Sequence, residues 1–366
     1  MKRRSGVILA LFFLLLGIPT ANAATNVVLT EPTHRQIDGL FIDDDLAMTL
    51  SVTGRLGSIV FNPPKNVQTL RIDPALIEEV VAMSNGYKLT DGSDGAGQIF
   101  AQAWLAQLTQ ATATNDVSVI VYGNPSRYWV NRLLADEAHF VLSASTKILE
   151  TLLNRPAKPV VSYHNKSQFT LTRSDIEAVN TATDNFRKTS MYVDPIKRDG
   201  YKLALMKLLN PDLPSARREY LIRDLTANAY LQLHMIYLSP GKFTVTSTHQ
   251  NIPITIANKF PTSAKINLYI HPANAKIRVA PVTQEVIRGN SKIQVLIPLT
   301  VLTSGSSGIR IELRTPSGDI LGEPLTYPIE LSVLSPVATW ITTTAAIVLF
   351  LAAIIQGIRR IRRGKK

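Results

Sequence analysis

Hydrophobic and polar positions alternate in two different rhythms, one in each half of the chain. From about residue 56 to 182, short β-branched runs are separated by stretches whose apolar residues recur at helical spacing. The predicted strands of this half are Ile59–Phe61, Val67–Ile72, Val117–Tyr122 and Val160–Tyr163. Because strands that alternate with helices usually pair in parallel through helical crossovers, this half is predicted to be a partial, barrel-like parallel α/β domain.

The helix starts in this half carry recognisable signals. Asp73 suits the N-cap of a helix, Pro74 its first turn, and Gly86 the position just beyond its end. Further helices are predicted over 98–109, with Ile99 on the apolar side, and over 146–153, 172–179, 201–209 and 216–237. Residues 185–199 are predicted to be a polar connection.

After Ser239-Pro240-Gly241 the apolar period changes from 3.6 to 2. Apolar triplets with this spacing occur at 252/254/256, 266/268/270, 293/295/297, 309/311/313 and 329/331/333. Two shorter runs, Phe243–Val245 and Ile277–Val279, bring the predicted strands to about seven. One apolar face per strand and turn residues between strands predict an all-β immunoglobulin-like sandwich over residues 239–335.

An apolar run, Val337–Ile358, follows the sandwich and contains no charged residue. At about 1.5 Å per residue it is long enough to cross a hydrocarbon core about 30 Å thick. The basic tail 359–366 comes next, with Arg359, Arg360, Arg362, Arg363, Lys365 and Lys366. This order predicts one C-terminal transmembrane helix with a cytoplasmic tail, and a buried core helix is the alternative.

The other end predicts export. Three basic residues precede an apolar core from Val7 to Ile18, and Ala21-Asn22-Ala23 has the form of a cleavage site, so residues 1–23 are predicted to be a signal peptide. An uncleaved anchor is the alternative. Residues 24–238 and the sandwich are then expected outside a cell membrane that the chain crosses once.

The location of the charges changes what the formal net charge of +12 means. Without the signal and the tail, 30 basic residues stand against 27 acidic ones. Such a balanced ectodomain does not predict a nucleic-acid partner, whereas the basic ends fit a lipid bilayer. The chain has no cysteine, which excludes disulfides and thiol chemistry.

Candidate chemistry is expected where parallel strands end. Three residues occupy such positions. Asp73 is the candidate catalytic carboxylate, and Tyr122 and Asn124 are the candidate binding residues. Helix capping is the alternative for both Asx-Pro pairs.

Two other acidic positions are candidates. Asp45 closes the cluster Asp43-Asp44-Asp45, and Asp194 in a third Asx-Pro pair could supply the second carboxylate of a glycoside hydrolase. Consecutive surface acids are otherwise simply solvated. The six histidines lack zinc-site spacing, so no metal and no cofactor is predicted, and the glycine-rich stretch 86–97 is interpreted as a flexible loop or lid.

Several segments resemble a known family. They are 71–76, 103–105, 121–125, 252–258 and 313–318. The likeness, over most of residues 56–366, is to an uncharacterised family of exported actinobacterial single-pass membrane proteins, often encoded beside the lipid II flippase. It implies a barrel-like domain, an Ig-like domain and a C-terminal anchor, and maps no catalytic residue. This chain differs in that its signal leads almost directly into the α/β region.

Two functions are compatible with this organisation. The first is a non-catalytic envelope protein that binds a cell-wall glycan or a partner protein in envelope assembly. The second is a carbohydrate-active hydrolase or deacetylase that uses carboxylates at the strand ends. A cleft with Asp73 about 5–10 Å from another carboxylate would favour the second, and helix capping without a cleft would favour the first.

Overall fold

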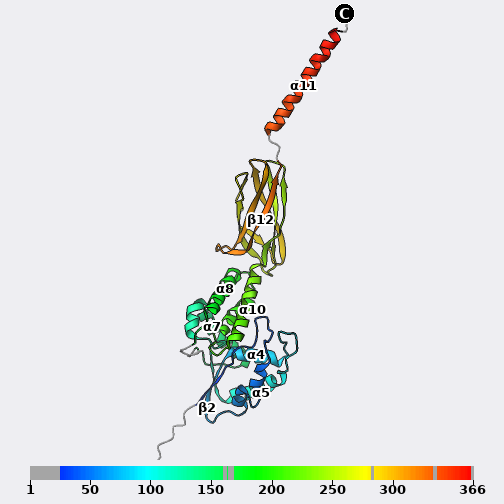
Figure 1. The fold of residues 1–366 in the computed structure, drawn as a ribbon. Helices are drawn as coiled ribbons and strands as arrows, with labels where there is room; N and C mark the ends of the chain where they lie inside the picture. Colours follow the sequence, from blue (N-terminus) through cyan, green and yellow to red (C-terminus); the bar gives the residue numbers. More distant parts are fainter. Residues whose placement is uncertain (1–24, 160–162, 164–168, 282–283, 333–335, 364–366) are drawn as a thin grey trace, which may run out of the picture. The chain divides into compact units, whose positions relative to one another are not determined.

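The computed structural model describes residues 25–159, 163, 169–281, 284–332 and 336–363 (Figure 1). The chain forms two compact units, and each unit contains one segment that is separated in sequence from the rest of that unit. The first unit runs to Thr181 and also contains Asp199–Thr226, whereas the second contains Ala182–Arg198 and everything from Ala227 onward. Each unit has its own hydrophobic core.

A parallel sheet lies at the centre of the first unit. Its strands are β1 (Thr25–Leu29), β2 (Val67–Ile72) and β3 (Asp116–Val119), in the order β1-β2-β3. A single parallel bridge from Ser118 to Lys158 extends it beyond β3. The parallel pairing and the bounds of β2 confirm the sequence prediction. Strand β1 was not predicted, and β3 ends three residues before the predicted end at Tyr122. The last predicted strand of this half falls, except for Tyr163, outside the described residues.

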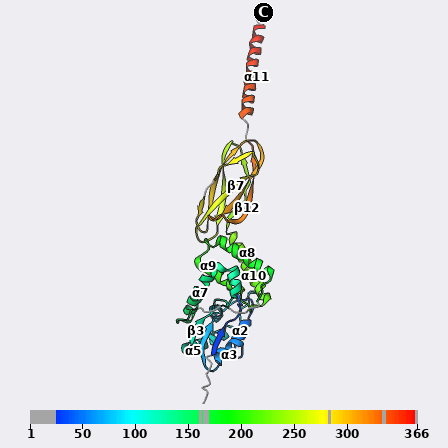
Figure 2. The ribbon, with the colours of Figure 1, turned by 90° about the vertical axis from the view of Figure 1, so that its left-hand side faces the viewer.

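Helices connect and cover these strands; Figure 2 labels α2, α3 and α5 close to β3. They are α2 (Asp45–Leu50), α3 (Arg55–Phe61), α4 (Pro74–Ser84), α5 (Gln98–Thr114), α6 (Arg127–Leu133) and α7 (Ala135–Leu153). Three more are α8 (Arg173–Thr189), α9 (Pro195–Leu208) and α10 (Ser215–Leu233). The start of α4 confirms the sequence prediction. At the start of α8, Asp175 N donates to Thr172 Oγ1 at 3.1 Å, which is the contact of a capping box.

The core of the first unit corrects two predictions. Residues 59–61 are the end of helix α3, because Leu56 and Val60 share one buried face at helical spacing. A short apolar run fits either structure, and here the neighbouring residues decide. On α5 the buried face is Ala101, Trp104, Leu108 and Thr112, while Ile99 is 76% exposed. Trp104 donates from Nε1 to the carbonyl of Leu56 at 3.1 Å, which joins α5 to α3.

The second unit contains two mostly antiparallel sheets, with strand orders β4-β6-β10-β8 and β5-β12-β11-β7-β9. The strands are β4 (Ile236–Leu238), β5 (Phe243–Val245), β6 (His249–Asn258), β7 (Ala264–Pro272), β8 (Ile277–Val279), β9 (Glu285–Ile287), β10 (Ser291–Val301), β11 (Gly305–Arg314) and β12 (Ile320–Leu331). All seven strands expected from the period of 2 are present, and their alternate apolar residues face one core, except that the predicted Val333 lies outside the described residues.

The segment predicted as a polar connection belongs to this core. It comprises the end of α8 and the start of α9, and Tyr192 within it is 2% exposed. The Tyr192 hydroxyl donates to the carbonyl of Lys265 on β7 at 2.7 Å. The polar composition of this segment therefore hid a residue of the sandwich core.

Beyond the sandwich the chain forms helix α11 (Pro336–Arg363). Its segment Trp340–Gly357 has a mean hydropathy of 1.8 over 18 residues, and none of it is buried against the rest of the chain. This helix is long and apolar enough to span a membrane.

Candidate functional site

Polar and charged side chains gather beyond the carboxyl ends of β1, β2 and β3. The loop after β1 supplies Thr30–Arg35, and the loop after β3 supplies Tyr122–Asn124. Asp73 lies between β2 and α4 as the N-cap of that helix, and α4 supplies Glu78 and Glu79. The ends of parallel strands meet at one edge of a sheet, which explains why residues so far apart in sequence lie together. We refer to this group, with Lys207, Asn210 and Arg217, as the strand-end cluster.

Asp73 lies at its centre and is completely buried. One carboxylate oxygen accepts from the backbone N–H groups of Ala75 and Gly123, each at 2.9 Å, and the other accepts from Thr30 Oγ1 at 3.1 Å. The bond from Ala75 is a helix N-cap, as Asp73-Pro74 predicted. Burial raises the pKa of Asp73 to about 7 against these three donors, and the nearby charge of Glu79 adds to the rise.

The loop after β3 is fitted closely to this carboxylate. Gly123 has φ +75°, and a Cβ at this position would lie 2.9 Å from Lys207 Cγ. Its carbonyl accepts from Asn210 Nδ2 at 2.9 Å. Asn124 is 6% exposed with φ +48°, a left-handed conformation that asparagine tolerates. Asn124 is thus a turn residue and not the helix cap suggested by Asn124-Pro125, since Ser126 is the residue before α6.

A second buried carboxylate, Glu79, joins three segments. It accepts from the Thr33 hydroxyl, from His34 N at 3.0 Å and from Lys207 Nζ at 3.3 Å. Glu79 is 4% exposed and Lys207 9%. Buried opposite charges persist only when paired, so removing either partner leaves an uncompensated charge.

His34 forms the third part of the cluster. Its Nδ1 lies 2.5 Å from Asp43 Oδ1, and its Nε2 lies between Glu31 Oε1 at 3.7 Å and Arg217 Nη1 at 3.1 Å. Burial and Arg217 oppose protonation, but hydrogen bonds to Asp43 and Glu31 raise the pKa of His34 to about 9. Both ring nitrogens of His34 are therefore occupied by side chains of the fold.

Tyr122 faces the more exposed side of the cluster. Its hydroxyl donates to Glu78 Oε2 at 2.8 Å, and Arg35 Nη1 lies 3.9 Å from Glu78 Oε1. The Glu78 side chain is 41% exposed and that of Arg35 28%. Burial raises the pKa of Tyr122 well above its usual value, and the charge of Glu78 contributes. Arg35 and Glu78 are therefore polar groups of the cluster that solvent reaches.

The sequence candidates are only partly brought together. Asp73, Tyr122 and Asn124 meet in the strand-end cluster, whereas the Asp45 side chain is 77% exposed and 3.9 Å from Arg217. Asp194 belongs to the other unit, where its Oδ1 accepts from Ile196 N at 2.9 Å at the start of α9. Among the described residues, no three His, Asp or Glu side chains are arranged to hold a metal ion.

The glycine-rich stretch 86–97 is fixed by hydrogen bonds. Asp44 Oδ2 accepts from Ala96 N at 3.0 Å, and Asp44 Oδ1 accepts from the Tyr87 hydroxyl. That hydroxyl in turn accepts from Gly97 N at 2.9 Å. These bonds differ from the expectation of a flexible lid, and they use an acid from a cluster that was expected to be solvated.

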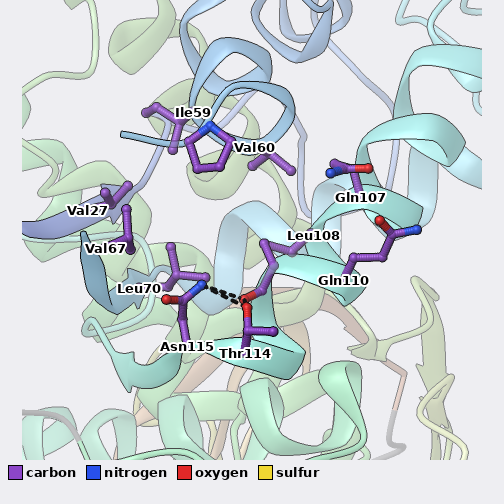
Figure 3. Close-up of a pocket in the computed structure, with 12 residues that line it drawn as sticks. Val27, Ile59, Val60, Val67, Leu70, Gln107, Leu108, Gln110, Thr114 and Asn115 are labelled. Carbon is purple, nitrogen blue, oxygen red and sulfur yellow. Dashed lines mark hydrogen bonds between the residues drawn. The ribbon is translucent and has the colours of Figure 1, made fainter. Parts of the chain in front are cut away.

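A cavity of about 200 Å³ lies at the opposite edge of the sheet (Figure 3). In its lining, Val67 is the first residue of β2 and Asn115 directly precedes β3. Most of the other lining side chains are apolar, among them Val27, Leu70 and Leu108. The cavity therefore has no part in the strand-end cluster.

Sequence reasoning missed Thr30, Glu79, Lys207 and the role of His34. The signal for Thr30 was its place directly after a strand, but β1 itself was not recognised. Glu79 and Lys207 are 128 residues apart, and no local pattern connects them.

The chain belongs to a family of unknown function, DUF6049, whose model matches residues 158–366. No curated protein matches the chain. Among solved structures, it is similar to WR4, a Caenorhabditis elegans MSP family member, at 15% identity and a TM-score of 0.21, with 26% of this chain and 97% of that chain covered. It is also similar to a PapD-like domain of human CEP192 at 12% identity and a TM-score of 0.22, with 28% and 86% covered.

Proposed function

We propose that this member of the DUF6049 family is a membrane-anchored extracytoplasmic envelope protein that binds without catalysing a reaction. Its ligand is a cell-wall glycan, and a partner protein in envelope assembly is the alternative occupant. In this proposal residues 1–23 are a signal peptide, α11 crosses the membrane once, and the basic tail is cytoplasmic. The finer resemblance, to exported actinobacterial proteins encoded beside the lipid II flippase, is part of the same proposal.

The state of Asp73 is the observation that carries the non-catalytic part. Both of its oxygens accept hydrogen bonds from within the fold, and its side chain has no exposed surface. A catalytic acid or base must come within hydrogen-bond reach of the substrate proton. A carboxylate that caps a helix and holds the loop after β3 instead stabilises the sheet edge.

Binding is supported by the groups around this rigid centre. Arg35 and Glu78 are both partly exposed, and Tyr122 donates a hydrogen bond to Glu78. Guanidinium and carboxylate groups form hydrogen bonds with hydroxyl-rich ligands, and rigid support lowers the entropy lost on binding.

The test uses the full chain in detergent micelles. It is incubated with insoluble cell-wall glycan, the glycan is pelleted, and both the protein in the pellet and the sugar fragments or acetate in the supernatant are measured. We expect retention of the protein without products above the protein-free level. Absence of retention would refute glycan binding, and product release would refute the non-catalytic assignment.

The alternative, a carbohydrate-active hydrolase or deacetylase, is favoured by one observation. A carboxyl group with a pKa of about 7 could donate a proton at neutral pH, as general acids do. If products are released, Asp73→Asn should abolish their release while retention persists. Release that is unchanged in this variant would exclude Asp73 as the acid.

A further inference from the structure

The outer face of the five-stranded sheet carries an aromatic and ionic patch apart from the strand-end cluster. Tyr269 on β7 pairs directly with Glu312 on β11, and Arg310 pairs with His271. Alternate residues of a strand point to the same face, so Arg310, Glu312 and Arg314 lie in one row beside Tyr269. We call Tyr269, Arg310, Glu312 and Arg314 the β7–β11 patch.

Tyr269 is the exposed centre of the patch. It is 42% exposed, whereas its neighbours along β7, Leu268 and Ile270, point to the opposite face of the sheet and are buried or half-buried. The guanidinium of Arg314 lies 4.5 Å from the centre of its ring, and Arg314 Nη2 donates to Glu312 Oε2 at 2.9 Å. The ion pair with Glu312 holds the Arg314 guanidinium in place, and its cation–π contact restrains the Tyr269 ring. Part of the Tyr269 side chain stays exposed to solvent.

Arg310 supplies an accessible cation beside this ring. Its side chain is 58% exposed, and its Nε is 3.8 Å from Glu312 Oε1, outside hydrogen-bond range. Two guanidinium groups therefore share one carboxylate. Lys265, exposed on the same face of β7, adds a further positive charge. The patch thus combines an open aromatic ring with an excess of positive charge and with a guanidinium fork suited to bidentate binding of a carboxylate.

We propose that the β7–β11 patch binds an acidic polysaccharide, with one sugar ring on Tyr269 and its carboxylate on the guanidinium of Arg310. The inference rests on the proposed glycan-binding function and adds to it a second site, on the sandwich, for acidic glycans. Tyr269 and Arg310 are diagonal neighbours, for which a separation of about 7–8 Å is typical. A single uronic-acid unit can reach across such a distance. A neutral glycan lacks the anion, and an acidic peptide lacks the sugar ring.

The experiment measures binding of polygalacturonate to the full chain in nanodiscs of zwitterionic lipid. Dextran serves as the neutral control and poly-glutamate as an anion without sugar rings. Tyr269→Ala and Arg310→Gln are compared with Tyr269→Phe, which keeps the ring, and with Lys292→Gln, which removes one exposed charge from β10 of the other sheet. Urea unfolding of each variant confirms that the sandwich is folded.

We expect Tyr269→Ala and Arg310→Gln each to weaken polygalacturonate binding by about tenfold or more, because each removes a principal contact. Tyr269→Phe and Lys292→Gln should stay within about twofold of the unchanged chain, well below the 1.4 kcal/mol of a tenfold change. Dextran should not bind. Equal binding of poly-glutamate, or equal loss in Lys292→Gln and Arg310→Gln, would overturn the proposal in favour of non-specific charge attraction.

This outcome is distinguishable from failure of the proposed function. If the unchanged chain is retained on cell-wall glycan but binds polygalacturonate no better than the two patch variants do, the site is wrong and the function stands. If the unchanged chain is not retained, the function itself fails. Polygalacturonate binding that is lost in both patch variants but kept in Tyr269→Phe supports the site.

Discussion

Replacing Asp73 by asparagine tests whether folding raises the pKa of this buried carboxyl group. Asparagine has nearly the same shape and keeps one oxygen, which can still accept from Ala75 N and Gly123 N. The hydroxyl of Thr30 can reverse its role and accept from the new amide. The substitution therefore removes the titration while it leaves most of the hydrogen bonds in place.

The magnitude follows from the pKa of Asp73, which burial raises from 3.8 to about 7 in the folded chain. The folded state holds this proton more tightly than the unfolded state. Ionisation therefore costs stability as the pH rises from 3.8, and the loss is complete above about 7. At about 1.4 kcal/mol per pH unit, the free energy of unfolding falls by about 4 kcal/mol across this range. The asparagine variant lacks this loss.

Urea unfolding of the full chain in micelles measures the effect, with fluorescence of the buried Trp104 as the probe of the first unit. Titrations between pH 4 and pH 8 give the difference in unfolding free energy between the asparagine variant and the unchanged chain. Other titrating groups contribute equally to both proteins and cancel. We expect the variant to gain about 4 kcal/mol on the unchanged chain between the two ends of this range.

A difference that stays constant from pH 4 to pH 8 would refute the reasoning, because it would mean that folding does not perturb the pKa of Asp73. A difference that moves in the opposite direction would show that the ionised form is stabilised. In that case the three hydrogen bonds to the carboxylate would outweigh the cost of its burial.

Three further predictions concern His34, Gly123 and α11. The pKa of His34 rises from 6.5 to about 9 on folding, so its protonation stabilises the fold below pH 6.5, and this stabilisation is lost as the pH rises through 9. In urea titrations, His34→Gln should therefore lower the free energy of unfolding by about 3 kcal/mol less at pH 9.5 than at pH 6. An equal cost at both pH values would exclude a raised pKa. Gly123→Ala should destabilise the first unit by about 1–3 kcal/mol more than Gly92→Ala, because both have positive φ but only Gly123 lies against Lys207; equal losses would contradict the close contact. Leu349→Arg, but not Leu349→Ala, should make part of the chain extractable from membranes by carbonate, since a central arginine costs about 2.5–3.5 kcal/mol on membrane insertion. If both variants stay entirely in the membrane fraction, that result would argue against a spanning helix.

The elements that the sequence predicted well are those whose signals are local. The period of 2 in 252–331 places alternate residues on one face, and every strand expected from it is present. Asp73-Pro74 marked a helix start because capping involves neighbours in the chain. The apolar run after the sandwich identified α11 by its length and composition.

The failures occurred where tertiary packing decides. Residues 59–61 have a β-branched composition but form a helix, because Leu56 and Val60 must face the same core. Tyr192 lies in a polar segment, yet it belongs to the core of the sandwich and its hydroxyl donates a hydrogen bond to β7. Burial against distant residues outweighed local propensity in both places.

The strand-end cluster shows most clearly which features the sequence determines and which depend on the tertiary structure. The sequence alone placed Asp73, Tyr122 and Asn124 at the ends of strands and predicted a capping role for Asp73. Only the tertiary structure showed that the same carboxylate holds Gly123, 50 positions away. Only the fold brings Lys207 to Glu79. Local hydrogen bonds leave a pattern in the sequence, whereas pairing between buried groups depends on how the helices pack around the sheet.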